Sequence, residues 1–230
     1  LLKPLEYRGF AARLFDAGQQ PGSLLGEDAM NIMHLCRGDL GLERLQGLLG
    51  RGFQLGQALN KWADRGIWVI SRADTAYPDC LKSKLKERRP ALLFGCGNPK
   101  LLTAGGLAMV GSRNVSPAEL EWTRKTAGDC ANNNHALVSG GARGVDQAAM
   151  LAALDAGGLS IGVLADGLSK AAIAREYRYA LREQRLVLVS PYDPDARFMV
   201  GHAMERNKFI YALAHAGLVV QTDLDKGGTW

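Results

Sequence analysis

Four short segments of the chain carry glycine, cationic, amide or hydroxyl residues that suit a phosphate-bearing ligand. They are Gly111-Ser112-Arg113, Ser139-Gly140-Gly141-Ala142-Arg143-Gly144-Val145-Asp146, Arg206-Asn207-Lys208 and Lys226-Gly227-Gly228-Thr229. Glycine lets a ligand approach the backbone, and an arginine fork can bind two phosphate oxygens. Backbone N–H groups at the start of a helix form a further anion site. Together the segments predict a phosphate-binding rim.

Each segment also has a purely structural interpretation, which the residues alone leave open. A glycine pair can make a tight turn, and an arginine at the end of a strand or helix can simply be solvated. Asp146 is expected to complement the positive end of a helix. The glycines match neither the G-x-G-x-x-G fingerprint nor the G-x-x-x-x-G-K-[ST] loop. A standard NAD enzyme and a P-loop NTPase are therefore disfavoured.

The elements that must position these segments alternate between strands and helices from Leu107 onward. Apolar runs predict strands, and the stretches between them predict helices. The expected strands are 107–110, 136–138, 160–164, 186–189 and 218–221, and the expected helices are 117–133, 144–156, 171–184 and 203–214. This alternation indicates an α/β fold, a doubly wound parallel sheet covered on both faces. Ligands on such sheets bind at the carboxyl ends of the strands, where the glycine-rich segments fall.

The chain divides into two predicted domains. Residues 1–72 predict a small helical domain, with short helices broken by glycine, and residues 73–230 predict an extended Rossmann-like domain. The glycine-containing stretch 48–52 suggests a helix-hairpin-helix that grips DNA, and a plain packing domain is the alternative. A helix should follow the Lys226–Thr229 turn, so the second domain is expected to continue beyond Trp230.

Composition limits the class of protein and its partners. The 230 residues are 47% hydrophobic, and 28 Lys and Arg against 23 Asp and Glu give a formal net charge of +5. This balance permits a polyanion without demanding one. The four cysteines form no C-x-x-C pair and the four histidines show no zinc-ligand spacing, so we expect no metal, no cofactor and a cytoplasmic location. No apolar run reaches the roughly 18 residues of a membrane span.

The order of the motifs, beginning with Tyr77-Pro78 and ending with Gly227-Gly228-Thr229, resembles that of the DNA-processing protein A family, also called DprA or Smf. The resemblance implies an extended Rossmann fold preceded by a small sterile-alpha-motif-like domain. It also implies a basic pocket for single-stranded DNA, formed by Arg113, the 139–144 loop, Arg206 and Lys208. As partners it implies RecA, loaded onto DNA in natural transformation, and a second copy of the chain in a homodimer.

Departures from the family pattern keep two other functions open. Lys208 stands where the family usually has arginine, and Ala149 and Met150 stand where it often has histidine. The alternatives are a nucleoside-monophosphate-cleaving enzyme of the related lysine-decarboxylase-like group and a nucleotide-binding sensor. No acid–base pair stands beside the glycine loops at a credible spacing, so we expect a protein that is not an enzyme. Aromatic side chains near the expected rim are Tyr192, Phe198 and Phe209.

Overall fold

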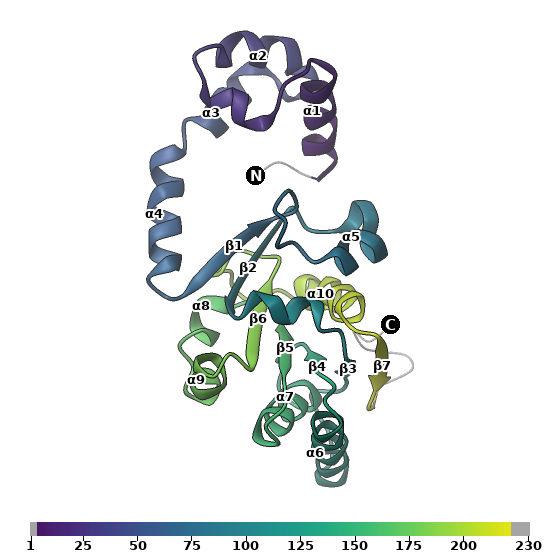
Figure 1. The fold of residues 1–230 in the computed structure, drawn as a ribbon. Coiled ribbons are helices and arrows are strands. Elements are labelled where there is room, and N and C mark those ends of the chain that lie inside the picture. The colour runs from purple at the N-terminus through teal and green to yellow at the C-terminus, as the bar shows by residue number, and fades with distance from the viewer. Residues whose placement is uncertain (1–3, 222–230) are drawn as a thin grey trace. The chain divides into compact units, whose positions relative to one another are not determined.

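The computed structural model describes residues 4–221, which form two compact units divided between Lys61 and Trp62. The first unit is helical and the second holds a sheet (Figure 1). The division lies earlier than the predicted boundary at residue 72. The reason is that strand Ile67–Ser71 pairs along its whole length with Leu92–Gly97, and so belongs to the sheet.

The first unit consists of short helices around a small apolar core. Its elements are α1 (Pro4–Asp16), η1 (Pro21–Leu25), α2 (Ala29–Cys36), η2 (Gly38–Leu40), α3 (Leu42–Leu49) and α4 (Gly52–Ala63). The core joins Phe10 and Leu14 of α1 to Ile32 and Met33 of α2. Helices this short are marginal alone, so their packing stabilises them. The likeness of this unit to a sterile-alpha-motif domain stays a prediction.

The described part of the second unit forms a seven-stranded sheet in the order β1-β2-β6-β5-β4-β3-β7. Its strands are β1 (Ile67–Ser71), β2 (Leu92–Gly97), β3 (Leu107–Val110), β4 (Leu137–Ser139), β5 (Ser160–Val163), β6 (Leu186–Ser190) and β7 (Ala216–Val219). Its helices are α5 (Asp79–Leu85), η3 (Lys86–Arg88), η4 (Pro99–Thr103), α6 (Pro117–Asn132), α7 (Val145–Asp155), α8 (Leu168–Ala171), α9 (Arg175–Arg182) and α10 (Val200–Leu213).

Strand direction confirms the α/β fold and corrects one detail of it. The strands from β6 through β5, β4 and β3 to β7 are parallel, as predicted. Strand β2 runs antiparallel to both of its neighbours, so the whole sheet is mixed. An apolar run is compatible with either direction, and mixed sheets are common among α/β folds. The direction of β2 was therefore not predictable from its residues.

Helices cover both faces of the sheet because side chains alternate between the faces along each strand. In β3, Ala108 and Val110 belong to one apolar core, and Met109 belongs to the other. Side chains of α5 and α10 contribute to the first core, and side chains of α6, α7, α8 and α9 contribute to the second.

The winding of the chain reverses at β3. Strands β4, β5 and β6 lie successively on one side of β3, and α10 then returns the chain to β7 on the other side. Ligands on open α/β sheets bind beside such a reversal, at the carboxyl ends of the strands. The loops that follow β3 and β4 meet there.

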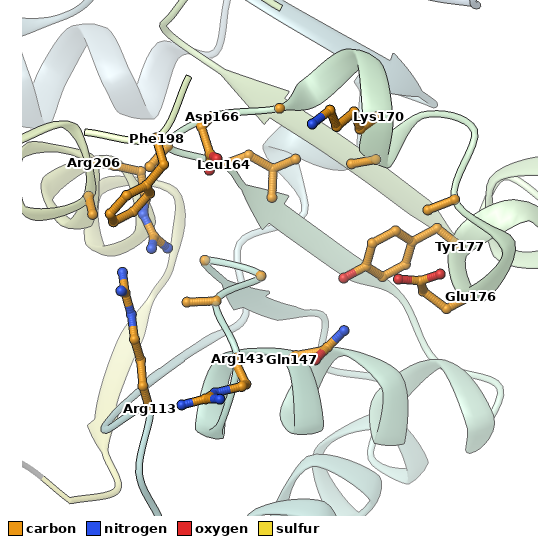
Figure 2. A pocket seen from close by; sticks show the side chains of 18 residues that line it. Arg113, Arg143, Gln147, Leu164, Asp166, Lys170, Glu176, Tyr177, Phe198 and Arg206 are labelled. Atoms are coloured by element: carbon orange, nitrogen blue, oxygen red, sulfur yellow. The ribbon is translucent and has the colours of Figure 1, made fainter. Parts of the chain in front are cut away.

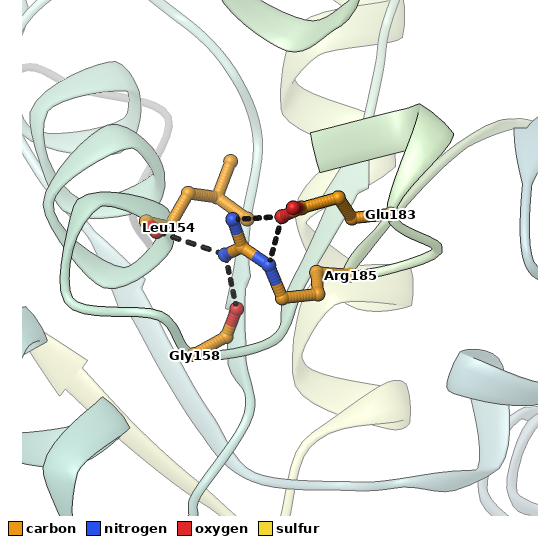
Figure 3. Close-up of polar contacts among 4 residues, drawn as sticks. All are labelled: Leu154, Gly158, Glu183 and Arg185. Atoms are coloured by element: carbon orange, nitrogen blue, oxygen red, sulfur yellow. Dashed lines mark hydrogen bonds and ion pairs between the residues drawn. The ribbon is translucent and has the colours of Figure 1, made fainter. Parts of the chain in front are cut away.

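Arg185 fixes the far end of α7, the helix whose first turn reaches this edge (Figure 3). Its Nη1 donates to the carbonyl oxygens of Leu154 at 2.8 Å and Gly158 at 3.2 Å. Its Nε and Nη2 donate to Glu183 at 2.8 Å and 2.7 Å. A cation at a helix C-terminus satisfies free carbonyls and complements the helix dipole.

We predict that Arg185→Met lowers the free energy of unfolding by about 1–3 kcal/mol, because charge-assisted hydrogen bonds to the end of α7 are lost. Urea denaturation followed by circular dichroism measures the change. The control is Arg182→Met, since Arg182 is exposed and its side chain makes no hydrogen bond within residues 4–221. An equal loss in both variants would contradict the proposed role of Arg185.

Candidate functional site

A pocket of about 540 Å³ opens at the carboxyl edge of the parallel strands (Figure 2). The loops after β3, β4 and β5 contribute to its wall, together with residues of α7, α8, α9 and α10. The pocket gathers five of the predicted site residues. They are Arg113, Gly140, Gly141, Arg143 and Arg206.

A buried ion pair organises the base of this pocket. Arg206 Nη1 lies 3.4 Å from Asp146 Oδ2, and the two residues are only 4% and 5% exposed. The backbone N–H groups of Gly111 and Ala142 also interact with the Asp146 carboxylate and favour its charged form. One carboxylate therefore ties together the turn after β3, the loop after β4 and helix α10.

The electrostatics of the pair are set by its burial. Burial raises the pKa of Asp146, while the charge of Arg206 and the two backbone N–H groups oppose that rise. Burial likewise lowers the pKa of Arg206, although a guanidinium keeps its proton in proteins. Asp146 does more than complement the dipole of α7, which was its expected role. Arg206 is buried, so it is not the solvated helix end that the structural interpretation allowed. It also lines the pocket, and its predicted contact with phosphate stays a prediction.

Two glycines of the loop after β4 are required by packing. A Cβ atom at Gly140 would overlap the Arg206 guanidinium. Gly144 has a φ of +94°, and a Cβ there would overlap the carbonyl oxygen of Ser112. Only glycine adopts this conformation readily and fits so close to a neighbouring backbone. These residues bring the loops together, besides leaving the backbone open to a ligand.

Ser112 and Ser139, both predicted to bind phosphate, have structural roles in this arrangement. Ser139 is the last residue of β4, fully buried, and its hydroxyl donates to the carbonyl oxygen of Met109. Its expected contact with phosphate is therefore wrong, because the strand continues one residue further than predicted and takes Ser139 into the sheet. The Ser112 hydroxyl donates to the Asn114 carbonyl at 2.8 Å and accepts from the Asn114 N–H at 3.1 Å, which shapes the turn after β3.

Arg113 and Arg143 are the exposed cations of the pocket that the sequence predicted. The Arg113 guanidinium lies 5.0 Å from the centre of the Phe198 ring, and Arg143 donates to the Asn114 side chain at 3.2 Å. Neither forms an ion pair within residues 4–221. The charge of Arg113 also contributes, after burial, to lowering the pKa of Arg206. The pocket thus holds positive charge that no carboxylate of the described chain neutralises by direct contact.

Two predicted site residues of α10, Asn207 and Lys208, lie away from the pocket. Lys208 pairs with Glu205 at 2.7 Å and lies 4.9 Å from the Phe209 ring centre, and neither Lys208 nor Asn207 lines the pocket. On α10, the side chains of residues 206 and 208 point in different directions, because successive helical residues are rotated by about 100°. Lys226, Gly227, Gly228 and Thr229 lie outside the described residues.

The sequence did not reveal four polar residues that line the same pocket. They are Gln147 of α7, Asp166 of the loop after β5, Lys170 of α8 and Glu176 of α9 (Figure 2). Asp166 follows a predicted strand, so the rule that ligands bind at the carboxyl ends of strands could have identified it. The other three residues reach the pocket only through the tertiary fold. Tyr177 also lines the pocket, and burial raises its pKa to about 12, so its hydroxyl remains a hydrogen-bond donor at neutral pH.

Of the three aromatic residues expected near the rim, Phe198 alone lines the pocket. Phe209 is buried in the core, and Tyr192 stacks on His202 with ring centres 3.8 Å apart. Within residues 4–221, no group of three or more His, Cys, Asp or Glu residues is arranged to hold a metal ion. The helices of that same range include none with both the length and the apolar character to cross a membrane.

We predict that Asp146→Ala lowers the free energy of unfolding by about 3–5 kcal/mol, because it leaves a buried guanidinium and two N–H groups without their partner. The double variant Asp146→Ala/Arg206→Met should recover part of the loss, since it removes the unpaired charge as well. Thermal and urea denaturation of the singles and the double give the coupling energy. Additive losses would show that the two side chains do not act as a pair. The exposed Asp155 of α7 provides the matched control, Asp155→Ala.

Comparison with known proteins gives a consistent picture for the second unit. Residues 68–230 match the family model described as DNA recombination-mediator protein A. Protein Smf of Escherichia coli is 36% identical over 140 residues, which are 60% of this chain and 37% of that protein. DNA processing protein DprA of Bacillus subtilis is 28% identical over 170 residues, which are 73% of this chain and 57% of that protein. The matches thus span about a third to a little over half of these curated relatives.

Solved structures of the same kind share the fold. DNA processing protein A of Streptococcus pneumoniae matches with a TM-score of 0.67 and 24% identity, over 99% of this chain and 81% of that chain. DNA processing protein A of Helicobacter pylori, described for its single-stranded DNA binding mode, matches with a TM-score of 0.56 and 28% identity, over 71% of this chain and 72% of that chain. Because the family model covers well over half of the sequence, the chain belongs to the DNA recombination-mediator protein A family.

Proposed function

We propose that this chain binds single-stranded DNA at the carboxyl edge of its sheet and acts as a recombination mediator. The observation that carries the proposal is the positive charge of Arg113, Arg143 and Lys170, which line one pocket and form no ion pair within residues 4–221. An anionic ligand would supply the missing negative charge. Membership of the family and the likeness to a DNA-binding relative support DNA as that ligand.

Binding of this kind needs no acid or base. Cationic side chains displace counterions from the phosphates, which supplies much of the free energy of association. Phe198 is 46% exposed beside Arg113 and offers a flat apolar surface to an unpaired base. Bases of a duplex are stacked on one another and cannot use this surface, so single strands should be preferred.

The role as mediator extends the proposal to partners. We infer RecA as the recombinase that the chain loads onto DNA in natural transformation, a homodimer as the active form, and the cytoplasm as its location. Family membership supports these points, and no surface within residues 4–221 identifies either protein partner. Light scattering of the purified chain measures its oligomeric state. The rate of RecA filament assembly on single-stranded DNA, compared with and without the chain, measures the loading of RecA.

The first binding prediction concerns salt. If about four phosphates are neutralised, the logarithm of the binding constant should fall against the logarithm of salt concentration with a slope near −3. Fluorescence anisotropy of a labelled oligonucleotide at several salt concentrations gives this slope. A duplex of equal length should bind more weakly at every concentration. Salt-independent binding, or a preference for duplex, would refute the proposal.

The second binding prediction concerns Arg113. Arg113→Ala should weaken DNA binding by about 1.5–3 kcal/mol, since a charge-assisted contact to phosphate is lost. Its melting temperature should stay close to that of the unmodified chain, because an exposed charge contributes little to folding. Arg182→Ala removes an exposed arginine outside the pocket and should leave binding unchanged. Equal weakening by both variants would show that the site is not specific.

The third prediction separates a binding protein from an enzyme. Asp166 and Glu176 both line the pocket, so carboxylates are available beside a bound nucleotide. Glycosidic cleavage would need one of these carboxylates against the ribose and a second group placed to protonate the leaving base. We nevertheless expect no release of free base, because the chain belongs to a family of recombination mediators. Chromatography after long incubation with nucleoside monophosphates tests this. Base release that Glu176→Gln abolishes would favour the nucleotide-cleaving alternative.

A further inference from the structure

A second hollow of about 820 Å³ adjoins the pocket and lies along helices α6 and α7. It extends from Gly144, just before α7, to Asp155, the last residue of α7. An α-helix rises 1.5 Å per residue, so this groove is roughly 16 Å long. The two hollows share Arg113, Arg143 and Gln147, which therefore form the boundary between them.

Charge in the groove is predominantly positive. Arg113 and Arg143 stand at its mouth, Arg124 of α6 lies along its wall, and Asp155 is its one carboxylate within the described residues. Arg124 is exposed, and its side chain makes no hydrogen bond or ion pair within residues 4–221. It therefore adds a third cation without a carboxylate partner to Arg113 and Arg143, which the groove shares with the pocket. This continuous positive wall suits the phosphates of a strand that leaves the pocket.

The groove is apolar below its cationic wall. Val115, Leu120 and Leu151 line it and are half-buried, and Ala148 and Ala152 leave space beside them. Apolar side chains flanked by cations suit a nucleotide, since its base has an apolar face and its phosphate is charged. Volumes of this order hold ligands larger than a single base.

We infer that the groove between α6 and α7 is a second nucleotide subsite, which takes the nucleotides that follow the one held in the pocket. The inference rests on the proposed binding of single-stranded DNA. One strand crosses from the pocket over Arg113 and Arg143, and its next phosphate contacts Arg124. The hydrogen bond from Arg143 to Asn114 holds the two sides of the crossing together.

The test compares Arg124→Glu with Lys125→Glu in the full chain. The two residues are neighbours on α6, both are exposed, and only Arg124 lines the groove. Binding is measured by anisotropy with labelled oligonucleotides of about 6 and about 16 nucleotides, lengths within the range of single-strand sites. On the longer strand, Arg124→Glu should raise Kd by about fivefold over Lys125→Glu. On the shorter strand, the two variants should differ less.

A salt series gives an independent readout. The slope in question is that of the logarithm of the binding constant against the logarithm of salt concentration. Arg124→Ala should reduce its magnitude by about 0.7, the value for one phosphate on a single strand, and Lys125→Ala should leave it unchanged. Equal behaviour of the Arg124 and Lys125 variants, together with weak binding by Arg113→Ala, would overturn the second subsite and leave the proposed function intact. Salt-insensitive or absent binding by the unmodified chain would overturn both. Melting temperatures confirm that each variant is folded.

Discussion

The buried contact between Asp146 and Arg206 is the interaction on which the rest of the site depends. It joins a carboxylate at the start of α7 to a guanidinium on α10, and these helices lie on opposite faces of the sheet. The same carboxylate holds the backbone after β3 and after β4. A buried charge is costly unless it is paired and hydrogen-bonded, so each of these segments must keep its place for the others to be stable. The pocket is the space that this arrangement leaves at the edge of the sheet.

A second consequence of the pair is electrostatic. Arg206 neutralises Asp146, so this carboxylate does not balance the charge of Arg113. The charge of Arg113 in turn helps to lower the pKa of Arg206. Arg143 and Arg124 face the same region without a carboxylate partner. Cationic side chains therefore outnumber carboxylates around the two adjoining hollows, and a bound polyanion would lower the repulsion between these cations. Net charge alone, at +5, gave only a weak indication of such a partner.

Much of the fold could be predicted because its signals are local. Apolar runs and glycine turns indicated each parallel strand in the described part of the second unit, and the capping box at Ser116 and Glu119 marked the start of α6. The break between α8 and α9 was missed, since it falls within Ala172–Ala174 and alanine favours a helix. At the site, Arg113 and Arg143 were found because they follow strands. Lys170 and Arg124 were missed because they reach the two hollows only through packing, and Ser139 was misassigned because one residue decides between strand and loop.

The close fit of Gly140 against Arg206 has a consequence for how this site can change in evolution. No side chain fits at position 140 while the guanidinium occupies its present place. Loss of Arg206 would free that space, but it would also leave Asp146 buried without its cation. The three positions are therefore epistatic, and the order of substitution matters. A residue larger than glycine introduced first at position 140 would have to displace the guanidinium from Asp146, whereas prior replacement of the ion pair by apolar residues would leave that space open.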